Sequence, residues 1–91
     1  MSQKKKWLQK KTTTEKAEQD HLVKDERLGP WPVPFGFQHE RWLRFKSQMK
    51  DGDELWEFSS PPITWKYLAG RAGLSIVRND KIVDSIVTIM N

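Results

Sequence analysis

The chain has 91 residues, a formal net charge of +4 and no cysteine. This length allows one small domain, and the lack of cysteine excludes a disulfide framework and thiolate metal sites. No apolar run reaches the ~20 residues that a membrane-spanning helix needs, and no apolar segment follows the basic start as in a secretory signal. We therefore expect a cytoplasmic protein that does not act at a membrane.

Residues 1–28 are expected to form a charged, largely disordered tail. They hold 8 Lys or Arg and 5 Asp or Glu, so their charge is +3, and residues 29–91 contribute only +1. Their few large apolar side chains bury too little surface to offset the entropy of ordering the segment. Basic residues around an aromatic ring also make this tail a candidate nucleic-acid site. That candidate site consists of Lys4, Lys5, Lys6, Trp7, Lys10 and Lys11.

Residues 29–91 are expected to form the single folded domain, which begins with a proline-rich arm at residues 29–37. Prolines at alternate positions favour an extended backbone for this arm. The arm carries Trp31, Phe35 and Phe37. These rings either cover the core, which is the favoured interpretation, or form an exposed surface for a partner protein. All three are therefore candidate partner-binding residues.

An amphipathic helix is predicted over residues 38–50. Trp42, Phe45 and Met49 recur at helical spacing, and Leu43 widens the apolar stripe. Gly52 is suited to ending this helix, because glycine readily adopts the left-handed conformation.

Residues 54–59 alternate in the manner of a strand, and we expect Trp56 to face the core. A short helix is then predicted to begin at Ser60, whose hydroxyl can cap it, with Pro61 in the first turn. Trp65, Leu68 and Ala69 would form its apolar stripe. Gly70 is the expected C-terminal cap.

A hairpin is predicted from residue 74 onward, with Asn79-Asp80 as its two-residue turn. This register pairs Ile76 with Val83 and Val77 with Ile82. Residues 82–90 also fit a helix, but their density of β-branched side chains favours a strand. The expected fold is therefore α+β: an antiparallel sheet of about three strands, packed by one amphipathic and one short helix.

The last part of the chain resembles a family of small uncharacterised bacterial proteins of unknown function. The resemblance covers about residues 50–91 and implies a compact bacterial domain, but it implies no activity. It is carried by Trp56-Glu57-Phe58-Ser59-Ser60-Pro61, Trp65, Leu68-Ala69-Gly70-Arg71 and Val83-Asp84-Ser85-Ile86-Val87.

The sequence contains little that points to catalysis. Its two histidines, His21 and His39, show no metal-ligand spacing, so neither a metal nor another cofactor is expected. Gly70-Arg71-Ala72-Gly73 has the Gly-x-x-Gly spacing of loops that clamp a phosphate, with Arg71 as the donor. The favoured alternative is that these glycines only end a helix and lead into a strand.

A non-enzymatic protein-interaction or regulatory module is therefore the leading interpretation, with another protein as the partner. The alternative is binding of nucleic acid or a phosphate ligand through the Lys-rich tail and the Gly70–Gly73 loop. A basic face that includes Arg71 would favour the second interpretation, whereas a pocket with a buried carboxylate would favour an enzyme.

Overall fold

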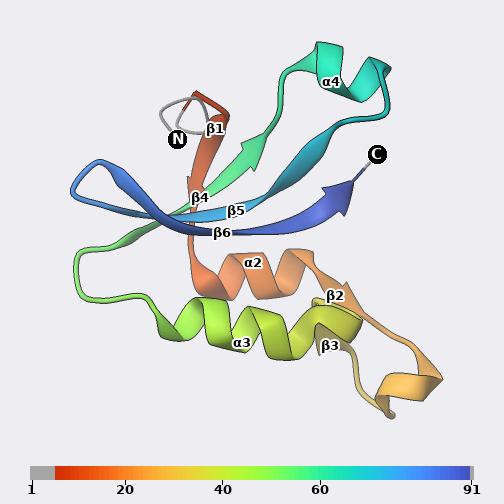
Figure 1. Ribbon diagram of the computed structural model, residues 1–91. Helices are drawn as coiled ribbons and strands as arrows, with labels where there is room; N and C mark the ends of the chain where they lie inside the picture. Colours follow the sequence, from red (N-terminus) through yellow and green to blue (C-terminus); the bar gives the residue numbers. More distant parts are fainter. Residues whose placement is uncertain (1–5, 91) are drawn as a thin grey trace.

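The computed structural model describes residues 6–90 and shows an α+β fold (Figure 1). Its main sheet is antiparallel, with the strand order β1-β4-β5-β6. These strands are β1 (Leu8–Thr12), β4 (Glu54–Ser59), β5 (Arg71–Arg78) and β6 (Lys81–Met90). A small second sheet pairs β2 (Leu22–Val23) with β3 (Val33–Pro34). The α-helices are α2 (Thr14–Asp20), α3 (His39–Ser47) and α4 (Pro62–Lys66), and short 3-10 turns occupy Glu26–Leu28 and Gly36–Gln38.

The described part of the N-terminal segment, residues 6–28, differs from the expected disordered tail. β1 pairs with β4, so that Thr12 lies opposite Leu55. α2 follows at once, capped by the Thr13 hydroxyl, which accepts a hydrogen bond from the Lys16 N–H. Ala17 of this helix is buried in the core. A count of large apolar side chains did not predict this ordered structure. The segment is held by main-chain hydrogen bonds with β4 and by the small buried side chain of Ala17.

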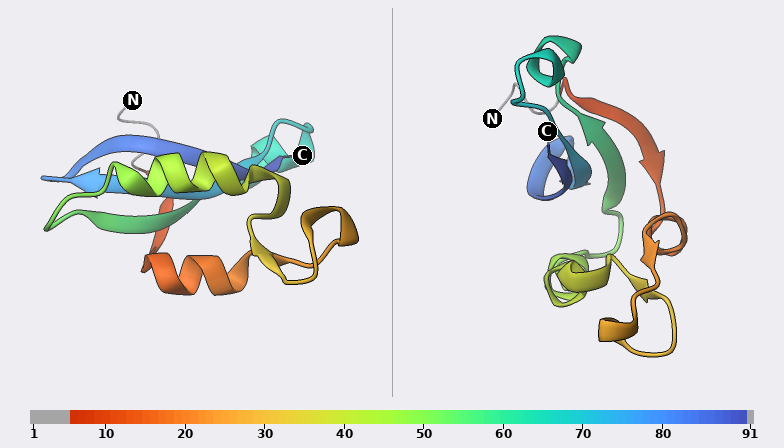
Figure 2. Two further views of the ribbon diagram at one scale, coloured as in Figure 1. Left: turned by 90° about the horizontal axis from the view of Figure 1, so that it is seen from below. Right: turned by 90° about the vertical axis from the view of Figure 1, so that its right-hand side faces the viewer.

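Helices α2 and α3 lie on the same side of the sheet, and the core lies between them and the strands (Figure 2). Trp42 is completely buried and Phe45 is buried beside it, as the predicted stripe requires. The helix is shorter than the predicted residues 38–50, because α3 ends at Ser47, and Met49 packs against the core from beyond its end. Leu43 is 42% exposed, so the stripe is narrower than expected. The buried core consists of Ala17, Phe35, Trp42, Phe45, Leu55, Leu74, Ile76 and Ile86.

An aromatic stack connects the proline-rich arm to this core. The Phe35 ring lies between His21, at 4.6 Å between ring centroids, and Trp42, at 4.4 Å. Phe35 adopts a left-handed backbone conformation with φ of 62°. Such a conformation is costly for a bulky side chain, so the stacking contacts must offset it.

Strand β4 presents Leu55 to the core, whereas Trp56 was the expected core residue. Leu55 is almost completely buried, and Trp56 is half-buried with its indole N–H donating to the Glu54 carboxylate at 3.0 Å. Because successive side chains of a strand point to opposite faces, Trp56 and Phe58 share the face that α2 and α3 do not cover.

Helix α4 is shorter than predicted and has different ends. Pro61 precedes it without a side-chain cap, and Leu68, rather than Gly70, takes the left-handed conformation with φ of 60°. Leu68 is exposed, so the expected apolar stripe is absent. Gly70 is required for another reason, since a Cβ there would lie 2.2 Å from the Trp65 ring. The Ser60 hydroxyl instead accepts the Arg71 main-chain N–H at 2.9 Å.

The β5–β6 hairpin confirms the predicted turn, with positive φ at both Asn79 and Asp80. Val77 pairs with Ile82 as expected. Ile76, however, lies opposite Asp84, because the register shifts by one residue between these pairs. The extra residue is Val83 of β6, and Ile76 faces the core with Leu74 through the regular alternation of β5.

Candidate functional site: an arginine and aromatic cavity

A cavity of about 360 Å³ lies on the face of the sheet opposite the core. Leu74 and Ile86 point into the core, so Ser75, Ser85 and Val87, their neighbours along β5 and β6, point to the cavity side. We call this hollow the arginine–aromatic cavity. Its lining comprises Trp7, Phe58, Val87, Ser75, Ser85, Arg41 and Arg71.

Two aromatic rings form the apolar wall of the cavity. Trp7 and Phe58 stack with their centroids 6.4 Å apart and their planes inclined by 27°. The Trp7 carbonyl accepts the Ser59 N–H at 3.0 Å, which fixes the Trp7 backbone beside β4. A planar apolar group that enters the cavity can therefore lie against a held indole ring.

Two hydroxyl groups contribute polar atoms to the cavity. Ser75 and Ser85 are directly opposite each other on β5 and β6, and their Oγ atoms are 2.7 Å apart. Ser75 is buried. Each hydroxyl has further hydrogen-bonding capacity, so the pair can satisfy a polar ligand atom without losing its own bond.

The two cationic groups come from different elements. Arg71 is the first residue of β5, and its guanidinium Nη1 donates a hydrogen bond to the Gly70 carbonyl at 2.9 Å. Arg41 belongs to α3, and its guanidinium forms no hydrogen bond or ion pair within residues 6–90. None of the described side chains that line the cavity is a carboxylate. The cavity therefore has the charge and donors to receive an anion.

The structure brings two of the sequence candidates, Trp7 and Arg71, into one site. The segment after Gly70 is a strand rather than an open phosphate loop, because Ala72 and Gly73 pair with both β4 and β6, and Arg71 pairs with β6. Their main-chain N–H groups lie in the sheet rather than around an open anion site. Gly73 is needed for close strand packing, since a Cβ there would lie 1.9 Å from the Ile86 carbonyl oxygen.

The candidate lysines have separate positions. Lys6 is exposed beside Trp7, and Lys10 is exposed on β1. Lys11 forms an ion pair with Glu54 at 2.9 Å. Lys4 and Lys5 lie outside the described residues.

Sequence reasoning missed Arg41, Phe58, Ser75 and Ser85 as site residues. Each of these residues has an ordinary place in its own element, and only the pairing of β1 with β4 and the packing of α3 beside β6 bring them together.

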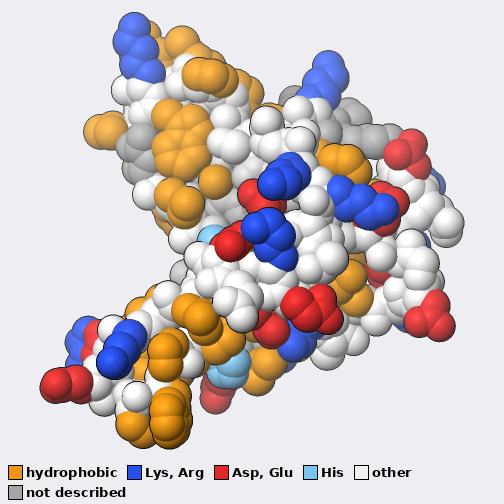
Figure 3. All heavy atoms as spheres, turned by 180° about the vertical axis from the view of Figure 1, so that it is seen from behind, with side chains coloured by type: hydrophobic (Ala, Val, Ile, Leu, Met, Phe, Trp, Pro, Cys, Tyr) orange, Lys and Arg blue, Asp and Glu red, His pale blue; other side chains and the backbone are white. Residues whose placement is uncertain are grey.

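The three aromatic residues of the arm have different environments. Phe35 is buried, as the favoured interpretation expected, whereas Trp31 is 77% exposed and Phe37 is 65% exposed. The Arg27 guanidinium lies 5.0 Å from the centre of the Phe37 ring. Figure 3 shows hydrophobic side chains gathered on two lobes, one over α4 and the other over the β2–β3 arm, with a hollow between them.

Both histidines have structural contacts outside the cavity. His21 stacks on Phe35, and His39 Nδ1 is 2.9 Å from the Pro34 carbonyl oxygen. Within residues 6–90, no three His, Asp or Glu side chains are arranged to hold a metal ion. No helix in that range is both long enough and apolar enough to cross a membrane.

Comparisons with known proteins provide no relative for this fold or cavity. No family model, curated protein or solved structure matches the chain. The resemblance to small bacterial proteins therefore stays a prediction.

Proposed function

We propose that the protein is a non-catalytic binding module whose arginine–aromatic cavity takes an anionic ligand that carries a planar ring. The observation that supports this is the presence of Arg41 and Arg71 in the same cavity as the Trp7–Phe58 pair, without a lining carboxylate. The arginines supply charge-assisted hydrogen bonds, and the rings supply a stacking surface.

The lack of a suitably placed base supports binding rather than catalysis. The Ser75 and Ser85 hydroxyls bond to each other, and both histidines are engaged with the arm around Phe35. A serine nucleophile needs a base within hydrogen-bond reach, and the described lining offers none. The absence of cysteine suits a reducing compartment, so we propose the cytoplasm as its location.

The proposal is tested with small probes that separate the charge from the ring. Adenosine 5′-monophosphate and phenyl phosphate carry both features, whereas adenosine and inorganic phosphate each carry one. Titrations followed by two-dimensional NMR should shift the Trp7 indole N–H and the Ser75 amide at lower concentrations of the two combined probes.

Two substitutions locate the binding. Arg41→Gln should weaken binding of both combined probes by roughly 2–5-fold, as expected for one exposed ion pair. Lys24→Gln removes the same charge from an exposed position outside the cavity and should change nothing. The proposal is wrong if millimolar amounts of either combined probe leave the cavity signals unmoved in the folded wild-type protein.

A second candidate function is docking of a partner protein on the exposed arm. Trp31 and Phe37 are more exposed than is usual for such large rings, and Leu22 and Val23 are exposed on the adjacent ribbon. A double Trp31→Ala, Phe37→Ala variant should keep its melting temperature but lose a partner that co-purifies from native cells. Tyr67→Ala, which removes an exposed ring at the residue that follows α4, is the matched control.

A further inference from the structure

The cavity continues into a second depression of about 260 Å³ along the β6 side of the sheet. Both hollows are lined by Arg41 and Ser85, so they adjoin each other. The second hollow adds Arg44, Gln48 and Asp84 together with the core residues Phe45 and Ile86, so it lies on the α3 side of the edge strand β6. We call the two together the arginine trough.

Three arginines follow the trough. Arg71 lines the first hollow, Arg41 lies where the two hollows meet, and Arg44 lines the second. Arg41 and Arg44 are three residues apart on α3, so their Cβ atoms are about 5–6 Å from each other. Neither guanidinium forms an ion pair within the described chain. A ligand with several negative charges can therefore contact more than one of these arginines.

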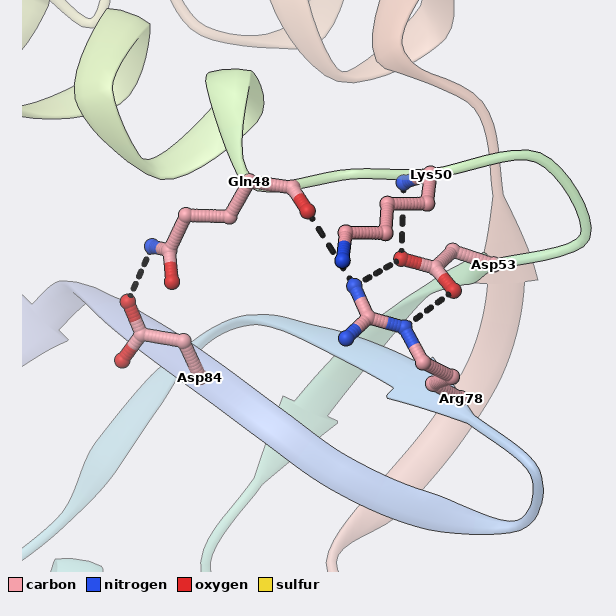
Figure 4. Close-up of polar contacts among 5 residues, drawn as sticks. All are labelled: Gln48, Lys50, Asp53, Arg78 and Asp84. Carbon is pink, nitrogen blue, oxygen red and sulfur yellow. Dashed lines mark hydrogen bonds and ion pairs between the residues drawn. The ribbon is translucent and has the colours of Figure 1, made fainter.

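One carboxylate also lines the trough. Asp84 lies in the second hollow, where its Oδ2 accepts the Gln48 amide at 2.6 Å and its Oδ1 accepts the Ser85 main-chain N–H at 2.8 Å (Figure 4 shows the first bond). Both oxygens therefore have donors of their own. Asp84 weakens the anion site at this end, but it forms no ion pair with Arg41 or Arg44, the two described arginines of α3 that line this hollow.

From this arrangement, and resting on the proposed function above, we infer that the trough binds single-stranded nucleic acid. A base stacks at Trp7 and Phe58, and successive phosphates lie against Arg71, Arg41 and Arg44. Stacking surfaces combined with a basic groove are the common way to hold single strands without reading their sequence. An acidic peptide matches the arginines but leaves the aromatic wall unused. A duplex cannot offer an unstacked base to the cavity.

The inference is tested by fluorescence anisotropy of the full chain with a labelled single-stranded 12-nucleotide probe of mixed sequence. Three phosphate contacts predict a log–log salt slope of roughly −2, because each contact on a single strand contributes about 0.7. Arg44→Gln should reduce the slope by about 0.7 and weaken binding roughly 2–5-fold. Lys24→Gln is the charge-matched control, and circular dichroism confirms that each variant is folded.

The outcomes separate this inference from the proposed function. The inference is supported if the single strand binds more tightly than a 12-bp duplex, a 12-residue polyglutamate and adenosine 5′-monophosphate. Arg44→Gln must also weaken binding of the single strand. If the mononucleotide binds the cavity but the strand binds no tighter, or Arg44→Gln has no effect, the inference is overturned and the proposed function stands. Equal binding of polyglutamate also overturns it, and failure of every probe overturns both.

Discussion

Glu18 joins the N-terminal segment to the core through a single carboxylate oxygen. Its Oε2 accepts the Trp42 indole N–H at 2.7 Å and the Lys46 ammonium at 2.8 Å. The bond from Lys46, followed by that from Trp42, lowers the pKa of Glu18 below its ordinary value of 4.5. Because Trp42 is fully buried, removal of the Glu18 carboxylate would leave its indole N–H without the acceptor that it has in the folded protein.

Glu18→Gln should therefore lower the free energy of unfolding at pH 7 by about 1 kcal/mol, a value kept small because the carboxylate is partly solvated. A carboxyl with a lowered folded-state pKa stabilises the protein above its unfolded pKa, and that contribution disappears as the pH falls below about 4.5. Urea unfolding of the wild type and the variant at pH 7 and pH 3 measures how much stability the Glu18 carboxylate contributes at each pH. Glu15→Gln, on the exposed side of α2, is the matched control and should have little effect. Equal losses in the two variants would contradict the assigned role.

At the scale of elements, an ion pair fastens the α3–β4 loop to the β5–β6 hairpin (Figure 4). Arg78 donates from Nε to Asp53 Oδ1 at 2.8 Å and from Nη2 to Oδ2 at 2.7 Å. Oδ2 also accepts the Lys50 main-chain N–H at 2.9 Å, and the Arg78 guanidinium reaches the Gln48 carbonyl. This fork geometry is the strongest form of a carboxylate–arginine contact.

The ion pair predicts a defined loss of stability in acid. The Arg78 hydrogen bonds, followed by the Lys50 N–H, lower the pKa of Asp53 from 3.8 to about 2. Its stabilisation is complete above pH 4 and is lost as the pH falls toward 2. Asp53→Asn should lower the melting temperature at pH 7 and flatten its decline between pH 4 and pH 2. Asp51→Asn, in the same loop, serves as the control, and an unchanged acid profile in Asp53→Asn would refute the prediction.

The elements that the sequence predicts well are those set by local chemistry. The Asn79-Asp80 turn and the spacing of Trp42 and Phe45 depend on neighbours a few residues away. The roles of Gly70 and Gly73 depend on distant contacts instead, because Gly70 faces the Trp65 ring and Gly73 faces the Ile86 carbonyl. Such close approaches exist only in the folded chain. The sequence alone therefore suggested helix capping or phosphate binding for these two glycines.

The site was predictable only in fragments for a similar reason. Trp7 and Arg71 were recognised separately, each from its immediate neighbours. Phe58 and Arg41 join them because β4 pairs with β1 on one side and α3 lies beside β6 on the other. No periodic pattern in the sequence indicates that these four distant parts of the chain lie together.

At the scale of the whole molecule, the N-terminal segment supplies one edge of the sheet and one covering helix. β1 extends the sheet beside β4, Trp7 forms a wall of the cavity, and Ala17 and Glu18 attach α2 to the core. The cavity and the folded domain therefore share the same segment. Binding should depend on the order of residues 7–20 as well as on the charge they carry.

Hydrogen exchange distinguishes this arrangement from a disordered tail. The Ala17 N–H, which bonds to the Thr13 carbonyl at 2.9 Å, and the β1 amides in the ladder with β4 should exchange slowly. Their protection should approach the global free energy of unfolding, about 5 kcal/mol or more for a domain of this length. The amides of Lys24 and Trp31, in exposed connecting segments, provide the fast reference. If Ala17 and the β1 amides exchanged as fast as these two, residues 8–20 would open independently of the sheet. Trp7 would then lack the fixed position that stacking in the cavity requires.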